Sequence, residues 1–321
     1  SLFQSKNYAE ARFSLCFRNY WCRGLINEET KMSWESIVSF KASIRWSDIH
    51  DDAFVDREGF PLLGYTAFSD CTKVVREVLI EIRKTSGSQQ LLRVRAPKEG
   101  LVGMGITGSC TVLIGAMMVS SPETVSLLLE HGVNPFETDI SGNDPFMFAS
   151  IFGRTDNVKF WLDRFPDWDL ERKNKVVGGV ALGHAVYMGP HRLELVKILV
   201  ENGASIDHRT DIGGSILTSL CECEDGSPEL LHLLLDHMNA TQLNRWLKYQ
   251  VRGGTLKWRT IRRLACFLAR YKLSDSGLLT ALAHETGSTA LYYAVQRGDV
   301  DVVNILLSHG ADPTIKNDLG K

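Results

Sequence analysis

The segment from Gly287 to Asp318 constrains the fold of this chain more than any other, because it has the pattern of two short helices followed by a loop. Thr289 and Asp299 stand where side-chain oxygens cap the first turn of a helix. Gly298 ends the first predicted helix, and Gly310 supplies the left-handed residue that ends the second. A unit this short cannot bury its apolar face alone, so we expect it to stack on similar units.

Weaker copies of this unit recur upstream. Ala294 in the first helix of this unit has equivalents in each upstream copy. From the N-terminus onward, successive equivalents are about 50, 33, 36, 35 and 74 residues apart. The matching positions are Thr66, Ala116, Ala149, Ala185 and Leu220. Three residues before each stands a large apolar residue: Leu63, Leu113, Phe146, Leu182, Leu217 and Leu291. The pattern predicts that both positions of every first helix are buried.

The second helix of each unit carries a pair of apolar residues four positions apart. The pairs are Val75 with Leu79, Val125 with Leu129, Val158 with Leu162, Val196 with Val200, Leu231 with Leu235, and Val303 with Leu307. We expect these pairs, together with Leu306 in the last unit, to form the buried stripe of each second helix.

This unit resembles the ankyrin repeat, most clearly over residues 287–318. The resemblance implies an all-α solenoid of about six to seven helix-turn-helix units, with partners docking on its concave side through first helices and loop tips. The repeats have diverged from the family pattern. Pro61 and Val180 replace the capping residue, and Asp70, Ser120 and Glu224 replace the turn glycine.

The rest of the chain is divided around these repeats. Residues 1–55 contain two helical patterns rich in large apolar residues, which we interpret as an N-terminal helical cap on the open end of the array. A separate docking helix or coiled-coil arm is the alternative. Within the array at 56–321 we expect a long insertion at about 83–108, and a degenerate basic unit with an additional short helix at about 239–286.

Composition excludes several classes of protein. The net charge of −2 gives no general attraction to nucleic acid or to an anionic membrane. No apolar run approaches the roughly 20 residues that a membrane span needs, and we see no signal peptide. Seven cysteines, an odd number without a Cys-x-x-Cys pair, predict an intracellular, cytoplasmic, reducing location. Both ends look cut, so we expect the chain to be part of a longer protein.

Motifs for chemistry are weak. Gly103, Gly105 and Gly108 formally match a dinucleotide-binding fingerprint, but the surrounding sequence lacks the βαβ pattern that such a site needs. Cys221 and Cys223, with His232 nearby, do not fit a common zinc motif. No nucleophile or phosphate-loop motif occurs. We therefore predict no catalytic residues, no cofactor and no metal.

One local charge pattern is unusual, since nine basic residues and no acidic residue lie between Arg245 and Leu273. On a helix, an apolar stripe would be buried: Trp258, Ile261, Leu264, Ala265, Leu268 and Tyr271. We predict Lys257, Arg259, Arg262 and Arg263 on its polar face as partner-binding residues. The alternative is a solvated face opposite the acidic run Glu222, Glu224, Asp225 and Glu229.

These features favour non-catalytic protein recognition, as a scaffold, adaptor or assembly subunit that uses the concave repeat surface. One alternative is that the basic helix at 257–272 binds an anion, a lipid headgroup or a calmodulin-like partner. Contact with a membrane surface and specific binding of nucleic acid are the less favoured uses of this helix. Another alternative is the regulatory part of a larger enzyme or channel. The sequence does not identify a partner.

Overall fold

A computed structural model describes residues 63, 67, 70, 72–84, 92, 93, 95, 109–187, 192–223, 227–274 and 276–321. The predicted N-terminal cap at 1–55, most of the insertion at 83–108, and its three fingerprint glycines lie outside these residues. The described part is all-α, and its only β pairing is two isolated bridges, Arg95 with Thr111 and Arg209 with Ser215.

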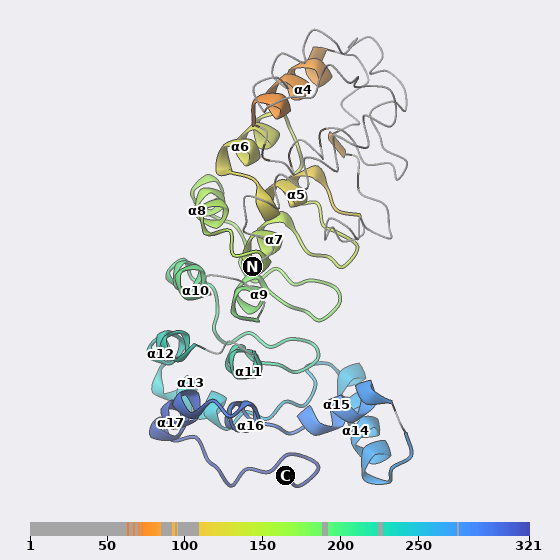
Figure 1. Cartoon of the computed structure of the whole chain (residues 1–321), viewed down its shortest axis with the longest axis vertical. Coiled ribbons are helices and arrows are strands. Elements are labelled where there is room, and N and C mark those ends of the chain that lie inside the picture. The colour runs from red at the N-terminus through yellow and green to blue at the C-terminus, as the bar shows by residue number, and fades with distance from the viewer. Residues whose placement is uncertain are drawn as a thin grey trace, which may run out of the picture. The chain divides into compact units, whose positions relative to one another are not determined.

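The helices alternate in short pairs, as the repeat pattern predicts (Figure 1). They are α4 (Thr72–Lys84), α5 (Val112–Val119), α6 (Pro122–Glu130), α7 (Pro145–Ile151), α8 (Thr155–Arg164), α9 (Ala181–Tyr187), α10 (Arg192–Glu201), α11 (Ile216–Glu222), α12 (Pro228–Asp236), α13 (Ala240–Leu247), α14 (Leu256–Arg270), α15 (Gly277–Glu285), α16 (Ala290–Arg297) and α17 (Val300–Ser308). The fold class is an all-α helical solenoid.

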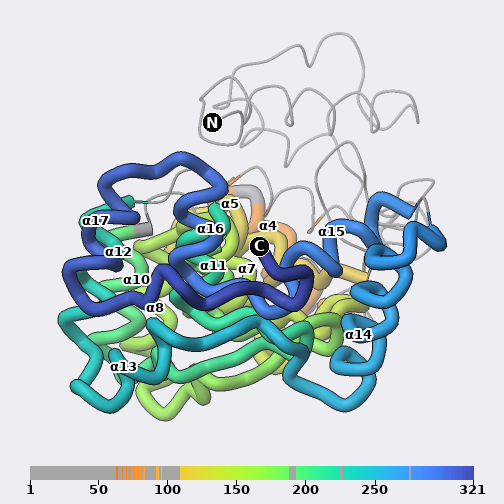
Figure 2. Tube along the Cα trace, turned by 90° about the horizontal axis from the view of Figure 1, so that it is seen from below, coloured from red at the N-terminus to blue at the C-terminus, as the bar shows by residue number. Residues whose placement is uncertain are grey.

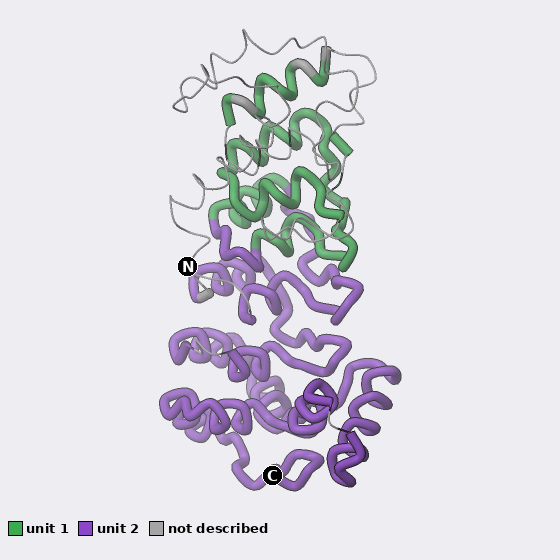
Figure 3. The backbone as a smooth tube through the Cα atoms, turned by 45° about the vertical axis from the view of Figure 1, so that its right-hand side comes forward, with its two compact units in different colours: residues 1–149, 156–164 green, residues 150–155, 165–321 purple. Residues whose placement is uncertain are grey.

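The chain divides into two compact units (Figure 3). Unit 1 comprises residues 1–149 and 156–164, and unit 2 comprises residues 150–155 and 165–321. In unit 1, α6 packs against both α4 and α5. Asp70, which replaces a turn glycine, adopts a left-handed φ of 52°, and its Oδ1 accepts a hydrogen bond from the backbone N–H of Ser121 at 2.8 Å. Ser121 is the N-cap of α6, so the Asp70 carboxylate stabilises the start of that helix, which a glycine could not do.

In unit 2 the helix pairs stack in register. The first helices α9, α11 and α16 contact in that order, and the second helices α10, α12 and α17 form a parallel row beside them (Figure 1). The last pair, α16–α17, therefore packs directly on α11–α12, although the predicted degenerate unit separates them in sequence.

The segment between these pairs is an insertion, and it does not form the degenerate repeat layer that we expected at 239–286. Helices α14 and α15 pack against each other as a hairpin, and they lie away from the row of second helices (Figure 2). The hairpin leaves and rejoins the stack at one point, since Val251 N–H donates to Ser288 O at 3.0 Å and Gly287 N–H donates to Val251 O at 2.8 Å. The 74-residue spacing thus reflects one repeat interrupted by an inserted hairpin.

The first helices are buried as predicted. The described positions equivalent to Ala294 are buried, and so are the apolar residues three positions before them. These positions are Ala116, Ala149, Ala185, Leu220 and Ala294 itself. Predicted caps are also confirmed in the last repeat, where Thr289 Oγ1 accepts Tyr292 N–H at 3.2 Å and Asp299 Oδ1 accepts Val302 N–H at 3.1 Å. Gly298 ends α16 with a φ of 74°.

The predicted stripe of the second helices is confirmed in α4, where Val75 and Leu79 are buried, and in α12, where Leu231 and Leu235 are buried, but it differs in the other second helices. In α17 the buried residues are Val302 and Leu306, whereas Val303 is half-buried and Leu307 is exposed. In α6, α8 and α10 the first residue of each predicted pair is buried, but the third position on, Leu128, Trp161 or Leu199, is buried in place of the predicted fourth, Leu129, Leu162 or Val200. The cause is helix geometry. When the residue before the predicted pair is also buried, the centre of the buried face shifts toward it, and the third position after the first member of the pair then lies closer to that centre than the fourth.

Candidate protein-interaction surface

Short loops of one kind connect the repeats, and we call them finger loops: Asp139–Asn143, Asn174–Gly179, Thr210–Gly214 and Asn317–Lys321. In each, a side-chain oxygen of the first residue accepts the backbone N–H of the last, at 2.7, 3.2, 2.9 and 3.0 Å respectively. The glycine near the end of each loop has a positive φ, as in Gly142 at 80° and Gly213 at 102°. The loops are therefore fixed locally by side chain and backbone together.

Finger loops of unit 2 are also joined to one another. Asp211 N–H donates to Val177 O at 2.7 Å, and Asp211 O accepts from Gly254 N–H at 2.8 Å. At the C-terminal end, Asp318 N–H donates to Thr286 O at 3.0 Å. These bonds hold successive loops of unit 2 at fixed spacing, so their tips form a continuous edge.

Close backbone packing explains two glycines in this edge. A Cβ atom at Gly213 would lie 2.4 Å from Gly253 N, and one at Gly253 would lie 2.6 Å from Arg259 N. Both residues also have a positive φ, at which an L side chain is strained. The loop that leads into α14 therefore lies directly on the finger loop of the preceding repeat.

Helix α13, which precedes the insertion, is fixed to the loop between α10 and α11. Asp207 accepts hydrogen bonds from Trp246 Nε1 at 2.8 Å and from Gln242 Nε2 at 3.1 Å, and its carboxylate pairs with Arg245. Burial opposes ionisation of Asp207, but these hydrogen bonds together hold its pKa below the usual value. Tyr249 Oη donates to Gly213 O at 2.8 Å.

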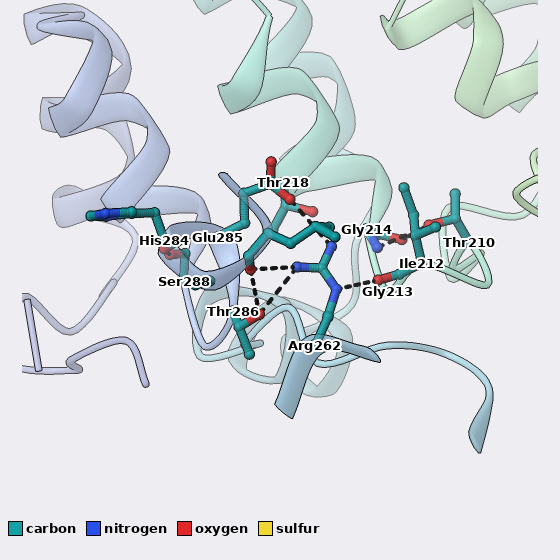
Figure 4. Close-up of polar contacts among 12 residues, drawn as sticks. Thr210, Ile212, Gly213, Gly214, Thr218, Arg262, His284, Glu285, Thr286 and Ser288 are labelled. Carbon is teal, nitrogen blue, oxygen red and sulfur yellow. Dashed lines mark hydrogen bonds and ion pairs between the residues drawn. The ribbon is translucent and has the colours of Figure 1, made fainter. Parts of the chain in front are cut away.

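Arg262 fixes the α14–α15 hairpin, and its position corrects the sequence prediction. The side chain is only 2% exposed, so it does not lie on the polar face of α14. Its Nε donates to Ile212 O at 2.8 Å, its Nη1 to Leu282 O at 3.3 Å, and its Nη2 pairs with Glu285 Oε2 at 3.3 Å (Figure 4). A single guanidinium thus joins α14, α15 and a finger loop. Because this guanidinium is buried, no partner could reach it.

The remaining predicted site residues are accessible. Lys257, Arg259 and Arg263 are all exposed, although Arg259 Nε also donates to Gly253 O at 3.2 Å. The predicted apolar stripe is only partly buried: Ala265 is buried, Trp258, Ile261 and Leu268 are half-buried, and Leu264 and Tyr271 are exposed. Because Arg262 occupies the centre of the packed face, the helix is rotated from the predicted orientation.

The structure describes part of the predicted acidic counterpart of α14. Glu222 is the member of that run whose pKa is affected by the charge of Arg262, whereas Glu224 and Asp225 lie outside the described residues. Loss of water around Glu222 and the nearby Glu285 carboxylate raise the pKa of Glu222. Among the residues of this run that the structure describes, none forms an ion pair with Lys257, Arg259 or Arg263.

A histidine pair lies behind the finger loops of unit 2. His208 Nε2 donates to Gly178 O at 2.8 Å, and Asn174 Nδ2 lies 3.3 Å from His184 Nε2. Burial, followed by the charge of His208, lowers the pKa of His184 to about 4. The pKa of His208 is also lowered, chiefly by burial. These histidines are neutral parts of the loop scaffold near pH 7.

The cysteines show packing rather than ligand geometry. Cys223 Sγ donates to Ser219 O at 3.0 Å, and burial raises the pKa of the Cys221 thiol to about 12. His232 packs against His309, with ring centroids 6.3 Å apart. Throughout the described ranges, no group of three His, Cys, Asp or Glu side chains is arranged to hold a metal ion. In the same part of the chain, no helix is long and apolar enough to cross a membrane.

Sequence reasoning missed the finger loops, although a signal exists. A polar residue precedes a glycine by three positions in Asp139–Gly142, Thr210–Gly213 and Asn317–Gly320, and by four in Asn174–Gly178. The polar side chain closes the loop and the glycine permits its turn, so this spacing marks each finger loop.

Comparisons with known proteins agree with this geometry. A family model described as Ankyrin repeat matches residues 286–318, and one described as Ankyrin repeats (many copies) matches residues 116–160. "Ankyrin repeat protein nuc-2" of Neurospora crassa is 28% identical over 191 residues, which cover 58% of this chain and 16% of that protein. The chain thus spans about a sixth of that relative's length.

A solved structure shows the same fold. The ankyrin repeat domain of Bcl-3, described as a unique member of the IkappaB protein family, aligns with a TM-score of 0.53 and 22% identity. The alignment covers 81% of this chain and 90% of the Bcl-3 chain. With the stacked helix pairs, their caps and the finger loops, these matches identify the chain as an ankyrin-repeat protein.

Proposed function

We propose that this chain is a non-catalytic protein-recognition module that binds its partner through the finger-loop tips and first helices of the repeats. Ankyrin repeats in general are protein-interaction modules. The observation that carries the proposal is the combination of fixed finger loops with apolar side chains exposed at their tips, Ile140 and Val176. A fixed loop loses little conformational entropy on binding, and an exposed apolar tip gains from burial.

The experiment compares two valines of nearly equal exposure. Val176, at a finger-loop tip, is 59% exposed, and Val300, at the start of the second helix α17, is 65% exposed. We expect Val176→Asp to remove specific partners recovered with the native chain by affinity purification and mass spectrometry, whereas Val300→Asp retains them. Equal loss with both variants, or with neither, would contradict recognition by the finger loops.

The role within a larger protein is a further part of this proposal. A scaffold, an adaptor and an assembly subunit would all use such a surface. The match to only 16% of the curated relative's length motivates the alternative that the chain is the regulatory part of a larger enzyme or channel. Sequencing the complete reading frame would distinguish these roles.

An intracellular, reducing location also belongs to the proposal. The described cysteines Cys110, Cys221, Cys223 and Cys266 are free thiols, and three of them are buried. Buried free thiols are typical of proteins that fold where disulfides do not form. Titration of thiols in the unfolded chain, purified without reductant, should find all of them reduced.

A second candidate surface is the basic face of α14, since its charges are exposed and Lys257 and Arg263 have no ion-pair partner in the described part of the chain. We propose that Lys257, Arg259 and Arg263 contact an acidic protein, and we exclude Arg262 because it is buried. Reversal of these three residues to Glu should abolish such binding, and added salt should weaken it, because exposed charges are screened over roughly 8 Å at physiological ionic strength. Binding that survives both treatments would assign recognition to the finger loops alone.

A further inference from the structure

The outward face of α14 is apolar as well as basic. Of the fourteen exposed large apolar residues in the described part of the chain, six lie between Leu256 and Leu278. Four of them belong to α14 or follow it directly: Leu256, Leu264, Phe267 and Tyr271 are 53% to 80% exposed. Isolated apolar side chains on a surface need no explanation, but a concentration of this kind marks an interaction site.

The four residues lie on one side of the helix, and we call them the outer stripe. Their spacings of eight, three and four residues return to the same face at 3.6 residues per turn. Phe267 and Tyr271 also contact each other, with ring centroids 4.9 Å apart. The outer stripe is therefore an apolar ridge that spans about four turns, with Thr260 between Leu256 and Leu264.

Positive charge borders this ridge. Lys257, Arg263 and Lys272 are exposed, and within the described residues none of the three has an ion-pair partner. Arg270, at the end of α14, uses its Nη2 to donate to Asp318 O, a backbone carbonyl that leaves its charge uncompensated. The surface thus combines apolar contact with unneutralised basic side chains, which matches an apolar, acidic ligand.

The ridge is held in place from behind. Arg262 projects from the opposite side of α14 and binds Ile212 O, Leu282 O and Glu285. Gly254 N–H adds a bond to Asp211 O from the loop that precedes the helix. Because the helix is fixed before any partner arrives, little ordering free energy is lost on binding.

We propose that the outer stripe of α14 docks an acidic amphipathic helix of a partner protein. This inference rests on the proposed recognition function, and it names the partner class for the basic face. Apolar side chains of such a helix, spaced three and four residues apart, would pack between Leu264, Phe267 and Tyr271. Its flanking Asp or Glu residues would pair with Lys257 and Arg263.

Charge favours a helix over an anionic membrane. The chain has a net charge of −2, so the residues outside Arg245–Leu273, which contain nine basic and no acidic residues, carry a net −11. An extended anionic membrane interacts with the net negative charge of the chain as well as with the ridge, whereas a single helix contacts only the local basic border.

The test uses three probes with the intact chain. The first is a synthetic helical peptide of about 18 residues with Leu at positions i, i+3, i+4 and i+7 and Glu on the flanks. The second keeps the Leu residues and replaces every Glu with Lys. The third is vesicles of phosphatidylserine and phosphatidylcholine. We expect the acidic peptide to bind, by fluorescence anisotropy, at least tenfold more tightly than the basic peptide or the vesicles.

Variants locate the binding. The pair Leu264→Ser with Phe267→Ser should weaken the acidic peptide at least tenfold, and so should Lys257→Glu with Arg263→Glu. The matched control, Leu193→Ser with Lys316→Glu, changes an exposed leucine and an exposed lysine elsewhere in unit 2 and should leave binding unchanged. All variants alter exposed side chains, so their melting should equal that of the parent.

Three outcomes would overturn the inference: no binding of the acidic peptide, equal binding of both peptides, or equal weakening by the control pair. Vesicle binding that depends on the outer stripe, without peptide binding, would assign the ridge to a membrane instead. Val176→Asp should not affect peptide binding. If that variant removes native partners while the acidic peptide fails to bind, finger-loop recognition stands and the docking of a helix on α14 fails.

Discussion

Two neighbouring regions of unit 2 are held in place by different contacts. In the last repeat, α16 and α17 bury apolar residues such as Ala294 and Leu306 against α11 and α12, while Val295, Val300 and Leu307 stay exposed. In the inserted hairpin, α14 packs around a buried arginine and exposes apolar residues. The repeat pair is thus held mainly by apolar burial, whereas the hairpin is held by the hydrogen bonds and ion pair of a buried arginine.

The largest expected difference concerns two leucines. Leu234 in α12 is fully buried, and Leu264 in α14 is more than half exposed. Leu234→Ala should lower the free energy of unfolding by about 3 kcal/mol, because it creates a cavity in the stack. Leu264→Ala should change it by less than about 0.5 kcal/mol. Urea unfolding followed by circular dichroism measures both values, and equal losses would abolish the distinction between the regions.

The second prediction concerns Arg262. Arg262→Ala removes the donor for two backbone carbonyls and leaves Glu285 without its partner, so the hairpin should lose about 2–3 kcal/mol of local stability. Hydrogen exchange should accelerate in α14 and α15 while α16 remains protected. Arg263→Ala, which changes an exposed neighbour, serves as the control. Faster exchange in α16 as well would mean that hairpin and stack unfold together.

Acid should act on the repeats rather than on the hairpin. The pKa of His184 in α9 is about 4 in the folded chain, against 6.5 when unfolded. Above pH 6.5 the neutral form is present in both states, but between pH 6.5 and 4 the unfolded state alone takes up the proton. Stability should therefore fall by about 2 kcal/mol between pH 7 and pH 5. His184→Gln should reduce this loss, and an unchanged pH profile in that variant would exclude His184 as its source.

The smallest expected effects come from two matched helix caps. Thr289 Oγ1 accepts Tyr292 N–H in the repeat, and Thr255 Oγ1 accepts Trp258 N–H in the hairpin. Thr289→Ala should reduce global stability by about 1 kcal/mol, whereas Thr255→Ala should only increase local opening of α14 by a similar free energy. Denaturant melts and hydrogen exchange separate the two, and global destabilisation by Thr255→Ala would show that the hairpin is part of the cooperative stack.

The repeat pairs could be predicted from the sequence because their pattern is local. Capping by Thr289, the turn at Gly298 and burial of Ala294 all follow from neighbouring residues. The one-position shift in α17 could not be predicted from paired apolar residues, since Val302 and Val303 are equally apolar and the stacking direction selects Val302.

The hairpin could not be predicted because long-range contacts decide its orientation. From its sequence, α14 has one apolar and one basic face, and Arg262 falls on the basic face. In the structure, carbonyl groups of Ile212 and Leu282, supplied by distant segments, satisfy the guanidinium and make its burial favourable. Burial of that single residue rotates α14, so that Leu264 and Tyr271 meet solvent while Lys257, Arg259 and Arg263 stay exposed.

The central claim is that the hairpin is inserted between Val251 and Gly287, in the connection from α12 to α16, and that α16 stacks directly on α11. Hydrogen exchange of the α16 amides, measured in a chain in which residues 252–286 are replaced by Asn-Gly, tests it most directly. Val251 and Gly287 already pair across this point, so a two-residue turn closes the loop. Our account predicts that Tyr293 and Ala294 keep the protection they have in the parent chain. Loss of that protection would show that residues 239–286 support α16 as a repeat layer, and would contradict the account.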